Sequence, residues 1–340
     1  MIYHVILGFI FLVALTAINP GLDWTRGFSS REGRPGYKTL VSSNTPFASL
    51  GEGESARAQE TPPPAPDPFA SIQLEARSAY VLDMQTGKLM YEKNSLEVMP
   101  LASLAKLLTA LILEERAPEG ALIPLSRDAI LQDESEGLEA GDKITKEDLI
   151  DFMLTASSND AAFAAGEFIG AAESGNERAR VSKFIALMNE KGRELGMRSS
   201  SFLNPHGLDV IINFHRISGA SGSAFDVAVL MDYIFRNYPH ILSATRETEI
   251  QISSARQRAY TAPNPNESIG AIPQLIGAKT GTTQLAGANI AFIFDAGFER
   301  PVLAVLLGST EEQRTEDAKK IVEASLQYIE REASENKTWD

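Results

Sequence analysis

Apolar residues recur along most of the chain with one of two spacings, and each change of spacing marks a change of structure. Residues 78–94 alternate between apolar and polar around Gly87, which predicts two strands joined by a tight turn. A period of three to four residues, typical of helices, then governs most of residues 100–238. The helices that it predicts span residues 100–115, 145–157, 160–172, 180–196 and 224–238.

The last third of the chain returns to strands and then closes with a helix. Apolar runs predict strands at 274–283, 289–297 and 301–309, and residues 310–330 form a helix whose exposed face alternates in charge. Tight turns between neighbouring strands imply an antiparallel sheet, with the long helical insertion as a second lobe beside it. The predicted fold class is therefore α/β, of the α+β type: an antiparallel sheet flanked by helices, with a helical second lobe.

The chain divides into four parts by composition. They are an N-terminal membrane anchor or signal (1–22), a disordered Pro/Gly/Ser-rich linker (23–70), a folded domain (71–332) and a polar tail (333–340). The linker ends in the Pro-rich run TPPPAPDP, which forms a stiff polyproline spacer.

The first part can be read as an uncleaved anchor or as a cleaved signal peptide. Residues 2–18 are almost wholly apolar, a little fewer than the roughly 20 that span a bilayer. No small-x-small cleavage site follows directly, which favours the anchor. Four cations follow the segment and none precedes it, and the positive-inside bias would then place that side in the cytoplasm, in conflict with export. These cations are Arg26, Arg31, Arg34 and Lys38.

Composition excludes several classes of function. The formal net charge of the 340 residues is -14, so we expect no nucleic-acid partner, because phosphate contacts need clustered Lys and Arg. The chain has no Cys, which rules out disulfides, thiolate metal sites and a Cys nucleophile. The four His residues lie in no metal-binding motif, so we expect neither a metal nor a cofactor.

Ser103 and Lys106 are the first candidate chemical pair. They lie three residues apart on one face of the predicted helix 100–115, so their side chains can touch. A Ser hydroxyl becomes a nucleophile when a base takes its proton, and desolvation can lower the pKa of a Lys from about 10.4 until it serves as that base. The helix amino end also favours negative charge near Ser103. The apolar surroundings that exclude water from Lys106 would come from Leu101, Leu104, Leu107 and Leu108. A helix cap and a solvated Lys remain the commoner meaning of such a pair.

Two further motifs follow in order. Ser157-Ser158-Asn159 lies between two predicted helices, where a turn can present a hydroxyl and an amide into a cleft between lobes. Lys279-Thr280-Gly281 occurs once, at the end of an apolar strand, where Gly281 lets a ligand backbone approach closely. Each motif is weak alone, but the three are strong together.

The order S-x-x-K, S-x-N, K-T-G is the signature of class A β-lactamases and penicillin-binding proteins. The stretches DMQTGKLMYEKN, ELGMRSSSFLNPHGLD and GSAFDVAVLM closely resemble the low-molecular-weight D-alanyl-D-alanine carboxypeptidases, peptidase family S11. The resemblance covers residues 78–329 and implies a β-lactamase/DD-peptidase-like fold. It also implies a serine-type carboxypeptidase that acts on peptidoglycan stem peptides ending in D-Ala-D-Ala and is acylated by β-lactams.

The resemblance assigns roles to matching positions. Ser103 would attack the peptide carbonyl and Lys106 would accept its proton, while backbone N–H groups of Ser103 and Thr282 hold the oxyanion. Ser157, coupled to Lys279, would pass a proton to the leaving D-alanine. The catalytic residues implied are Ser103, Lys106, Ser157 and Lys279. The substrate-binding residues implied are Asn159, Thr280, Gly281 and Thr282, with the two Thr facing the terminal carboxylate. The enzyme would be extracytoplasmic and held to the cytoplasmic membrane by its N-terminus, or secreted if the segment is cleaved.

This chain departs from the family pattern in places, and alternatives stay open. Ala105 stands where the family often has Thr, and Pro265 where some members carry a basic residue that could bind the carboxylate. The short remainder after the closing helix leaves no room for the C-terminal β-domain of some members. A class A-like β-lactamase is one alternative, although Glu194 lacks the Pro and Asn of the deacylating loop. A DD-endopeptidase and a non-catalytic wall-binding homologue are the others. A Ser–His–Asp hydrolase lacks its G-x-S-x-G elbow, and His206 is interpreted as a loop residue with a structural hydrogen bond.

Overall fold

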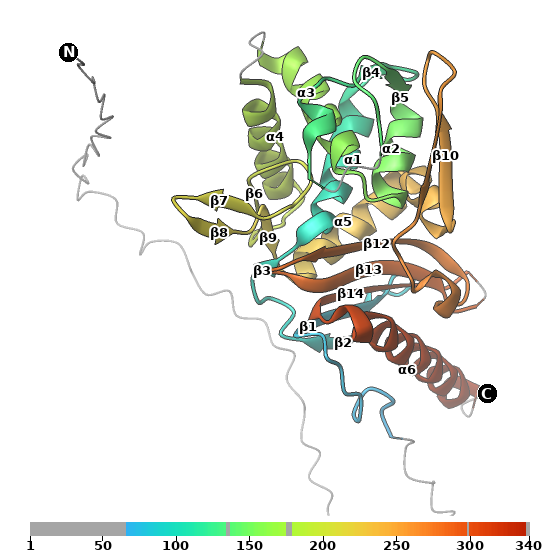
Figure 1. Ribbon diagram of the computed structural model, residues 1–340. Helices are drawn as coiled ribbons and strands as arrows, with labels where there is room; N and C mark the ends of the chain where they lie inside the picture. The colour runs from blue at the N-terminus through green and yellow to red at the C-terminus, as the bar shows by residue number, and fades with distance from the viewer. Residues whose placement is uncertain (1–65, 134–136, 175–178, 298, 338–340) are drawn as a thin grey trace, which may run out of the picture. The chain divides into compact units, whose positions relative to one another are not determined.

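The computed structural model describes residues 66–133, 137–174, 179–297 and 299–337, and a five-stranded sheet forms the base of this part of the chain (Figure 1). Its strands follow the order β12-β13-β14-β1-β2, and every neighbouring pair is antiparallel. They span β1 Ser78–Asp83, β2 Lys88–Lys93, β12 Leu275–Thr283, β13 Gly287–Asp295 and β14 Pro301–Ser309. The predicted antiparallel sheet is therefore confirmed, and β12 lies at its edge.

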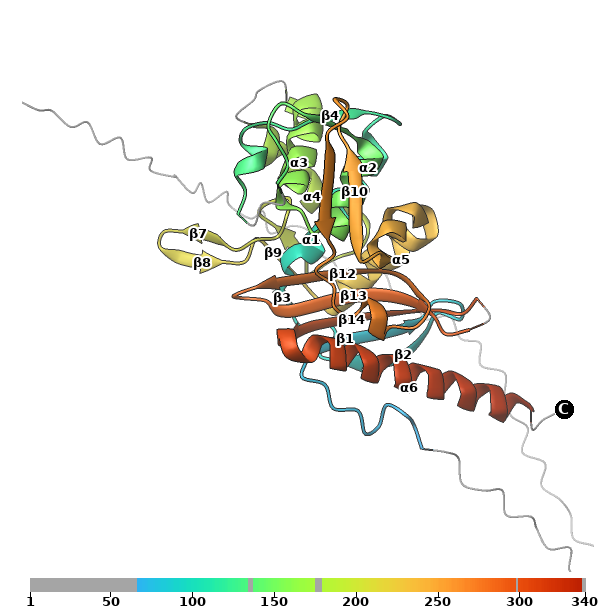
Figure 2. The same cartoon turned by 45° about the vertical axis from the view of Figure 1, so that its right-hand side comes forward.

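Among the described residues, six α-helices pack against this sheet or form the lobe beside it. They span α1 Ala105–Arg116, α2 Lys146–Thr155, α3 Asn159–Ser174, α4 Arg180–Glu194, α5 Ala224–Asn237 and α6 Glu311–Lys337. α5 packs against β14 and β1, whereas α6 packs against β13 and β14 (Figure 2). α6 continues to Lys337, past the end predicted at residue 330.

α5 and α6 can cover opposite faces of the sheet because successive side chains along a strand point to opposite faces. Three residues of β14 enter the core shared with the helical lobe: Leu303, Val305 and Leu307. The three residues between and before them enter the core shared with α6: Val302, Ala304 and Leu306. An apolar run without alternation, as in the sequence of β14, is thus typical of a strand buried on both faces.

α1 runs through the middle of the helical lobe. Every residue from Ala105 to Leu113 is buried, and the helix contacts α2, α3, α4 and α5. A helix that is apolar all round belongs in a core, which explains why residues 100–115 carry no clear polar stripe. Truncating one of its buried leucines should cost about 2–5 kcal/mol of stability.

The predicted start of α2 is confirmed by its cap. Thr145 accepts a hydrogen bond from the backbone N–H of Asp148 at 3.2 Å. α5 begins with a full capping box, in which Ser223 and Asp226 satisfy each other's backbone N–H.

Short strands and turns connect these elements and were not predicted, because each has too few residues to establish a period of apolar positions. β3 Met99–Pro100, β9 Ala220–Gly222 and β6 Ser201–Phe202 form one small sheet. Three ribbons pair β4 Leu122–Pro124 with β5 Lys143–Thr145, β7 Val210–Ile212 with β8 His215–Ile217, and β10 Glu249–Ser253 with β11 Ala259–Pro263. The 3₁₀ turns in the described ranges include η1 Ala102–Leu104, η2 Ala129–Leu131, η4 Pro239–Arg246 and η5 Ile269–Ala271.

One prediction about the start of α1 is wrong. Ser103 lies in the 3₁₀ turn η1 and not within a continuous α-helix from residue 100. The reason is tertiary: Met99–Pro100 pairs with β9, and the N–H of Leu101 donates to the carbonyl of Ala220 at 2.8 Å. Ala102 then takes a left-handed conformation, with φ at +50°, before the helix can begin.

The predicted anchor or signal (1–22), almost all of the predicted linker (23–70) and the last three residues lie outside the described residues. Within the described ranges, no helix is both long and apolar enough to cross a bilayer.

Candidate active site

Ser103 and Lys106 meet at the junction between the sheet and the helical lobe. The Nζ of Lys106 donates a hydrogen bond to the Oγ of Ser103 at 2.7 Å, as their spacing predicts. Lys106 is 0% exposed. All four leucines predicted to wall the pair are also buried: Leu101, Leu104, Leu107 and Leu108. The burial removes the water that would solvate an ammonium, which favours the neutral amine that a proton acceptor needs.

Asn159 is the second acceptor for Lys106. Its Oδ1 accepts a hydrogen bond from Lys106 Nζ at 2.6 Å, and its Nδ2 donates to the carbonyl of Asp133 at 2.8 Å. The sequence predicts that Asn159 binds the peptide, whereas in the structure both of its polar atoms are already engaged. The structure therefore gives Asn159 a further role, which is to orient the amine of Lys106.

Ser157 and Lys279 form a second hydroxyl–amine pair. Lys279 Nζ donates to Ser157 Oγ at 2.8 Å and to the carbonyl of Thr280 at 2.8 Å. Ser157 stands between α2 and α3 with φ at +63°, a left-handed conformation that costs about 1–3 kcal/mol in a non-Gly residue. Such strain is typical of functional positions. Ser158, the middle residue of the motif, instead accepts a hydrogen bond from the N–H of Ala161 and so caps α3.

Gly281 brings the edge strand β12 against the nucleophile turn. A Cβ at this position would lie 2.7 Å from the N of Ser103 and 3.2 Å from the Cβ of Ala102. The sequence predicts close approach of a ligand at Gly281; the structure places the Ser103 turn there. Because no side chain intervenes, the backbone N–H of Ser103 can lie next to the strand.

Asn289 ties the same turn to the sheet and was not among the residues predicted for the site. Its Nδ2 donates to the carbonyl of Pro100 at 3.0 Å, and its Oδ1 accepts from the N–H of Gly308 at 2.8 Å. It lies on β13 within an otherwise apolar run, and this interruption is the signal that could have identified it.

An open cavity of about 600 Å³ lies in front of Ser103. Its lining residues are Ser103, Ala156, Ser157, Pro265, Glu267, Thr280, Gly281, Thr282, Thr283, Gln284, Glu311 and Arg314. The cavity thus brings together the S-x-x-K serine, the S-x-N serine and the K-T-G strand, which the sequence assigns to one site. Glu194, the residue considered for a β-lactamase, is exposed at the end of α4 and does not line it.

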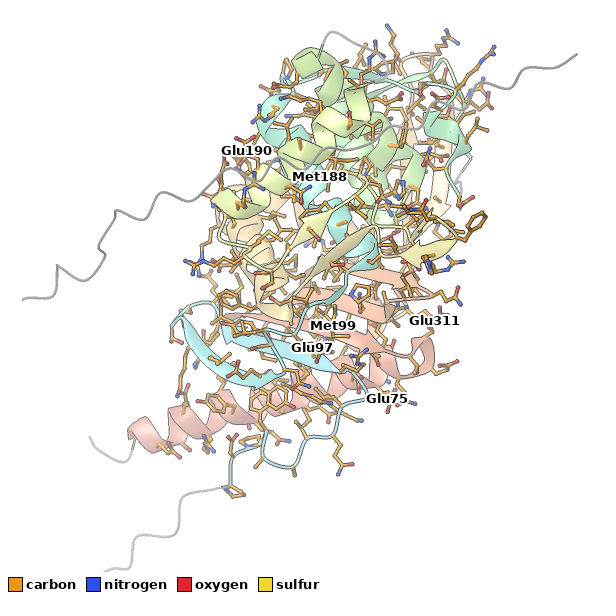
Figure 3. The ribbon with its side chains drawn as sticks, turned by 90° about the vertical axis from the view of Figure 1, so that its left-hand side faces the viewer. Glu75, Glu97, Met99, Met188, Glu190 and Glu311 are labelled. Atoms are coloured by element: carbon orange, nitrogen blue, oxygen red, sulfur yellow. The ribbon has the colours of Figure 1, made fainter. Side chains whose placement is uncertain are left out.

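Arg314 is the cavity residue that sequence reasoning missed. It is 7% exposed, and its Nη1 donates to Thr282 Oγ1 at 3.2 Å. Its buried Nε has no hydrogen-bond partner among the described residues. Burial lowers the pKa of this guanidinium, while the charges of Glu267 and Glu311 oppose that shift. Glu311 lies at the amino-terminal end of α6 (Figure 3).

A signal for Arg314 was present in the helical period of α6. The buried residues Ser325, Ile321 and Ala318 follow one another at steps of four and three toward the amino terminus. A further step of four reaches position 314, so Arg314 lies on the buried face of the helix. An arginine on the apolar face of a helix, near its end, indicates an anionic partner.

His206 lies next to Lys106 without being part of the hydroxyl–amine pairs. It is 6% exposed, and its Nδ1 accepts a hydrogen bond from the N–H of Leu208 at 3.2 Å. Burial lowers the pKa of His206 to about 3. The structural hydrogen bond predicted for this loop residue is therefore present.

Comparison with known proteins identifies the family. The sequence profile of the D-alanyl-D-alanine carboxypeptidases, peptidase family S11, matches residues 60–311. The chain is 29% identical over 262 residues to the carboxypeptidase DacF of Bacillus subtilis, covering 75% of this chain and 63% of that protein. It is 28% identical over 265 residues to a D-alanyl-D-alanine endopeptidase of Pseudomonas aeruginosa, covering 76% of each.

A solved structure with the same fold supports this assignment. Penicillin-binding protein D2 of Listeria monocytogenes, in its ampicillin-bound form, superposes with a TM-score of 0.59 at 27% identity, over 74% of this chain and 98% of that one. The predicted β-lactamase/DD-peptidase-like fold is confirmed. The chain belongs to the D-alanyl-D-alanine carboxypeptidase family, peptidase S11.

Proposed function

We propose that this protein is a serine-type D-alanyl-D-alanine carboxypeptidase that acts on peptidoglycan stem peptides through an acyl-enzyme. The observation that carries the proposal is the buried hydrogen bond between Ser103 and Lys106, which faces the same cavity as Ser157 and the K-T-G strand. The name of DacF, a relative of which this chain spans 63%, supports the substrate class.

Acylation would begin at Ser103. Its Oγ forms a bond to the carbonyl carbon between the two D-alanines, and its proton passes to the neutral amine of Lys106, 2.7 Å away. The carbonyl electron pair moves onto oxygen. Two backbone N–H groups, of Ser103 and Thr282, would hold this oxyanion, and the close contact of β12 with the Ser103 turn at Gly281 supports their pairing.

Collapse of the tetrahedral intermediate breaks the C–N bond, and the leaving amine needs a proton. Ser157 is suited to deliver it, because its Oγ accepts a hydrogen bond from Lys279 and its own hydroxyl proton stays available for donation. Lys106 would return the proton that it took from Ser103 along this route. Water then attacks the acyl carbonyl carbon, the ester bond to Ser103 Oγ breaks, and a proton from the water returns to Ser103 through Lys106, which releases the shortened peptide.

The substrate would bind as an added strand along the edge strand β12. Thr280 and Thr282 lie two residues apart on this strand and line the cavity. Arg314, which donates to Thr282, would supply the cation for the terminal carboxylate in place of the basic residue absent at Pro265.

β-Lactams should acylate Ser103 as strained mimics of the same amide. The Listeria penicillin-binding protein D2 was solved in ampicillin- and cefotaxime-bound forms, which supports this expectation at 26–27% identity. Intact-mass spectrometry after incubation with a penicillin should show one adduct, absent in Ser103→Ala. A fast steady-state turnover of nitrocefin would instead favour the β-lactamase alternative.

The decisive assay uses purified muropeptides and mass spectrometry. Loss of one D-alanine per pentapeptide, abolished by Ser103→Ala, is the expected result. Cleaved cross-links with intact pentapeptides would overturn the proposal in favour of an endopeptidase, the activity for which the Pseudomonas relative is named. No adduct and no cleavage would favour a non-catalytic wall-binding protein.

We also propose that the N-terminal segment holds the enzyme to the outer side of the cytoplasmic membrane, or exports it if cleaved. The apolar run at residues 2–18, followed by a Pro-rich linker, supports this placement. Membrane fractionation with external protease digestion tests it: a membrane-bound form that is digested only from the cytoplasmic side would contradict it.

A further inference from the structure

We infer that the loop Asn204–Leu208 is a brace that fixes the nucleophile turn, and that Asn204 and Gly207 are positioning residues for acylation. The inference rests on the proposed acylation of Ser103. The loop carries no group assigned to the chemistry above, yet it contacts the turn before Ser103 and the helix that carries Lys106.

The nucleophile turn needs external support because of its backbone conformation. Ala102 precedes Ser103 with φ at +50°, which costs roughly 1–2 kcal/mol for an L-residue. Bonds at Leu101 and Pro100 fasten the turn on its amino-terminal side. On its carbonyl side, Ala102 accepts a backbone hydrogen bond from the N–H of Ala105, which lies within the same turn, so further support for the left-handed residue must come from a tertiary contact.

Gly207 packs directly against that carbonyl. A Cβ at Gly207 would lie 1.9 Å from the O of Ala102 and 3.1 Å from the Cβ of Ala105. Gly207 also has φ at +85°, so two independent features require glycine here. The backbone of the loop therefore blocks any outward rotation of the Ala102 peptide.

Asn204 holds Gly207 in that place. Its Oδ1 accepts a hydrogen bond from the N–H of Gly207 at 2.6 Å, and its Nδ2 donates to the carbonyl of Leu208 at 2.8 Å. On the outer side, a Cβ at Gly219 would lie 2.0 Å from the O of Leu208 and 2.4 Å from Asn204 Nδ2. The loop is thus enclosed between the nucleophile turn and the strand region before β9.

Thr109 connects the brace to α1. Its Oγ1 donates to the carbonyl of Pro205 at 2.6 Å, and both partners are buried. Thr109 lies three residues after Lys106 on α1, so the same loop contacts the element that carries the nucleophile and the element that carries its base. The burial of His206 next to Lys106 is a consequence of this attachment.

The expected effect follows from this geometry. Loosening the loop should leave the cavity and non-covalent binding largely unchanged, because no residue from 204 to 208 lines the cavity. It should lower the rate constant of acylation, since a misplacement of the nucleophile by about 1 Å can cost roughly 100-fold.

The test compares Asn204→Ala with a matched control, Asn189→Ala, in the full-length protein. Asn189 makes the same kind of bonds to the backbone of Phe202: its Nδ2 donates to O at 2.9 Å and its Oδ1 accepts from N at 3.0 Å. Its hydrogen bonds, which include one from Nδ2 to the carbonyl of Ile185, reach neither the nucleophile turn nor α1. Stopped-flow labelling with a fluorescent penicillin over a concentration series separates the acylation rate constant from the dissociation constant.

Both variants should lower the melting temperature by a few degrees. Asn204→Ala alone should lower the acylation rate constant, by about 10- to 100-fold, with a dissociation constant within about twofold of wild type. Asn204→Asp, which keeps the acceptor for Gly207 N–H and loses the donor to Leu208, should recover part of the rate. Equal acylation rate constants in the two alanine variants would refute the proposed brace. Weaker non-covalent binding with an unchanged acylation rate constant would refute it as well.

A second variant covers the case in which Asn204→Ala does not fold. Thr109→Val removes the bond from α1 to Pro205, together with a long contact of 3.9 Å to Met188 Sδ, and keeps the shape of the side chain. It should reduce the acylation rate constant several-fold with unchanged binding, and a wild-type rate would refute the inference. Failure of the proposed function is distinguishable, because the wild-type protein itself would then take no label.

Discussion

Replacing Arg314 by glutamine would remove the one guanidinium that lines the cavity in front of Ser103 in the part of the chain that the structure describes. The side chain is 7% exposed and donates to Thr282 Oγ1, and its buried Nε has no hydrogen-bond partner among the described residues. A hydrogen bond to a charged group is worth about 1.5–3 kcal/mol. This corresponds to a fall of about 10- to 150-fold in kcat/KM for a substrate with a free carboxylate. We expect the lower half of that range, because the charges of Glu267 and Glu311 already oppose an anion at this position.

The assay pairs two substrates, an N-acylated peptide ending in D-Ala-D-Ala and its C-terminal amide. Arg314→Gln should lose activity on the acid and change by less than about threefold on the amide, because only the acid presents a carboxylate to the guanidinium. Lys319→Gln is the matched control: it removes a cation from the same helix at an exposed pair with Glu316, where such pairs contribute little. Equal losses on acid and amide would refute the reasoning and show that Arg314 acts through the fold.

Three further outcomes are expected. Gly281→Ala should lower the rate of penicillin acylation by about 100- to 1,000-fold, because the new Cβ would lie 2.7 Å from the N of Ser103 and displace an oxyanion donor; labelling at the wild-type rate would contradict this. Thr145→Ala should lower the free energy of unfolding in urea by about 1 kcal/mol and leave kcat/KM unchanged, since it removes only the cap to Asp148; an unchanged unfolding midpoint would be inconsistent with that role. The folded-state pKa of His206, about 3, lies below the unfolded value of about 6.5, so its contribution to stability is complete above pH 6.5 and is lost as the pH falls toward 3. By pH 5 the wild-type protein should lose about 2 kcal/mol of unfolding free energy through this group. If urea titrations show the same fall in unfolding free energy with pH for His206→Asn as for the wild type, His206 is excluded as its cause.

The sequence by itself determined the parts of this protein that depend on neighbouring residues. The period of apolar positions located the helices and the five strands of the main sheet, because backbone geometry sets a repeat of 3.6 in one and 2 in the other. The contact between Ser103 and Lys106 followed from their spacing of three residues, and the cap at Thr145 followed from a local motif. The order of three motifs indicated that Ser157 and Lys279 belong with them, although no local rule fixed a distance.

Only the tertiary structure decided which distant groups meet. Lys279 reaches Ser157 across 122 residues, and Asn289 reaches the carbonyl of Pro100 across 189. Such contacts depend on strand order and register, which a local period does not encode. The same packing overrode a local preference at Ala102, where pairing with β9 and support from Gly207 hold a left-handed residue before the helix. It also buried Arg314, whose sequence neighbours are polar, because the face of a helix is chosen by what it packs against.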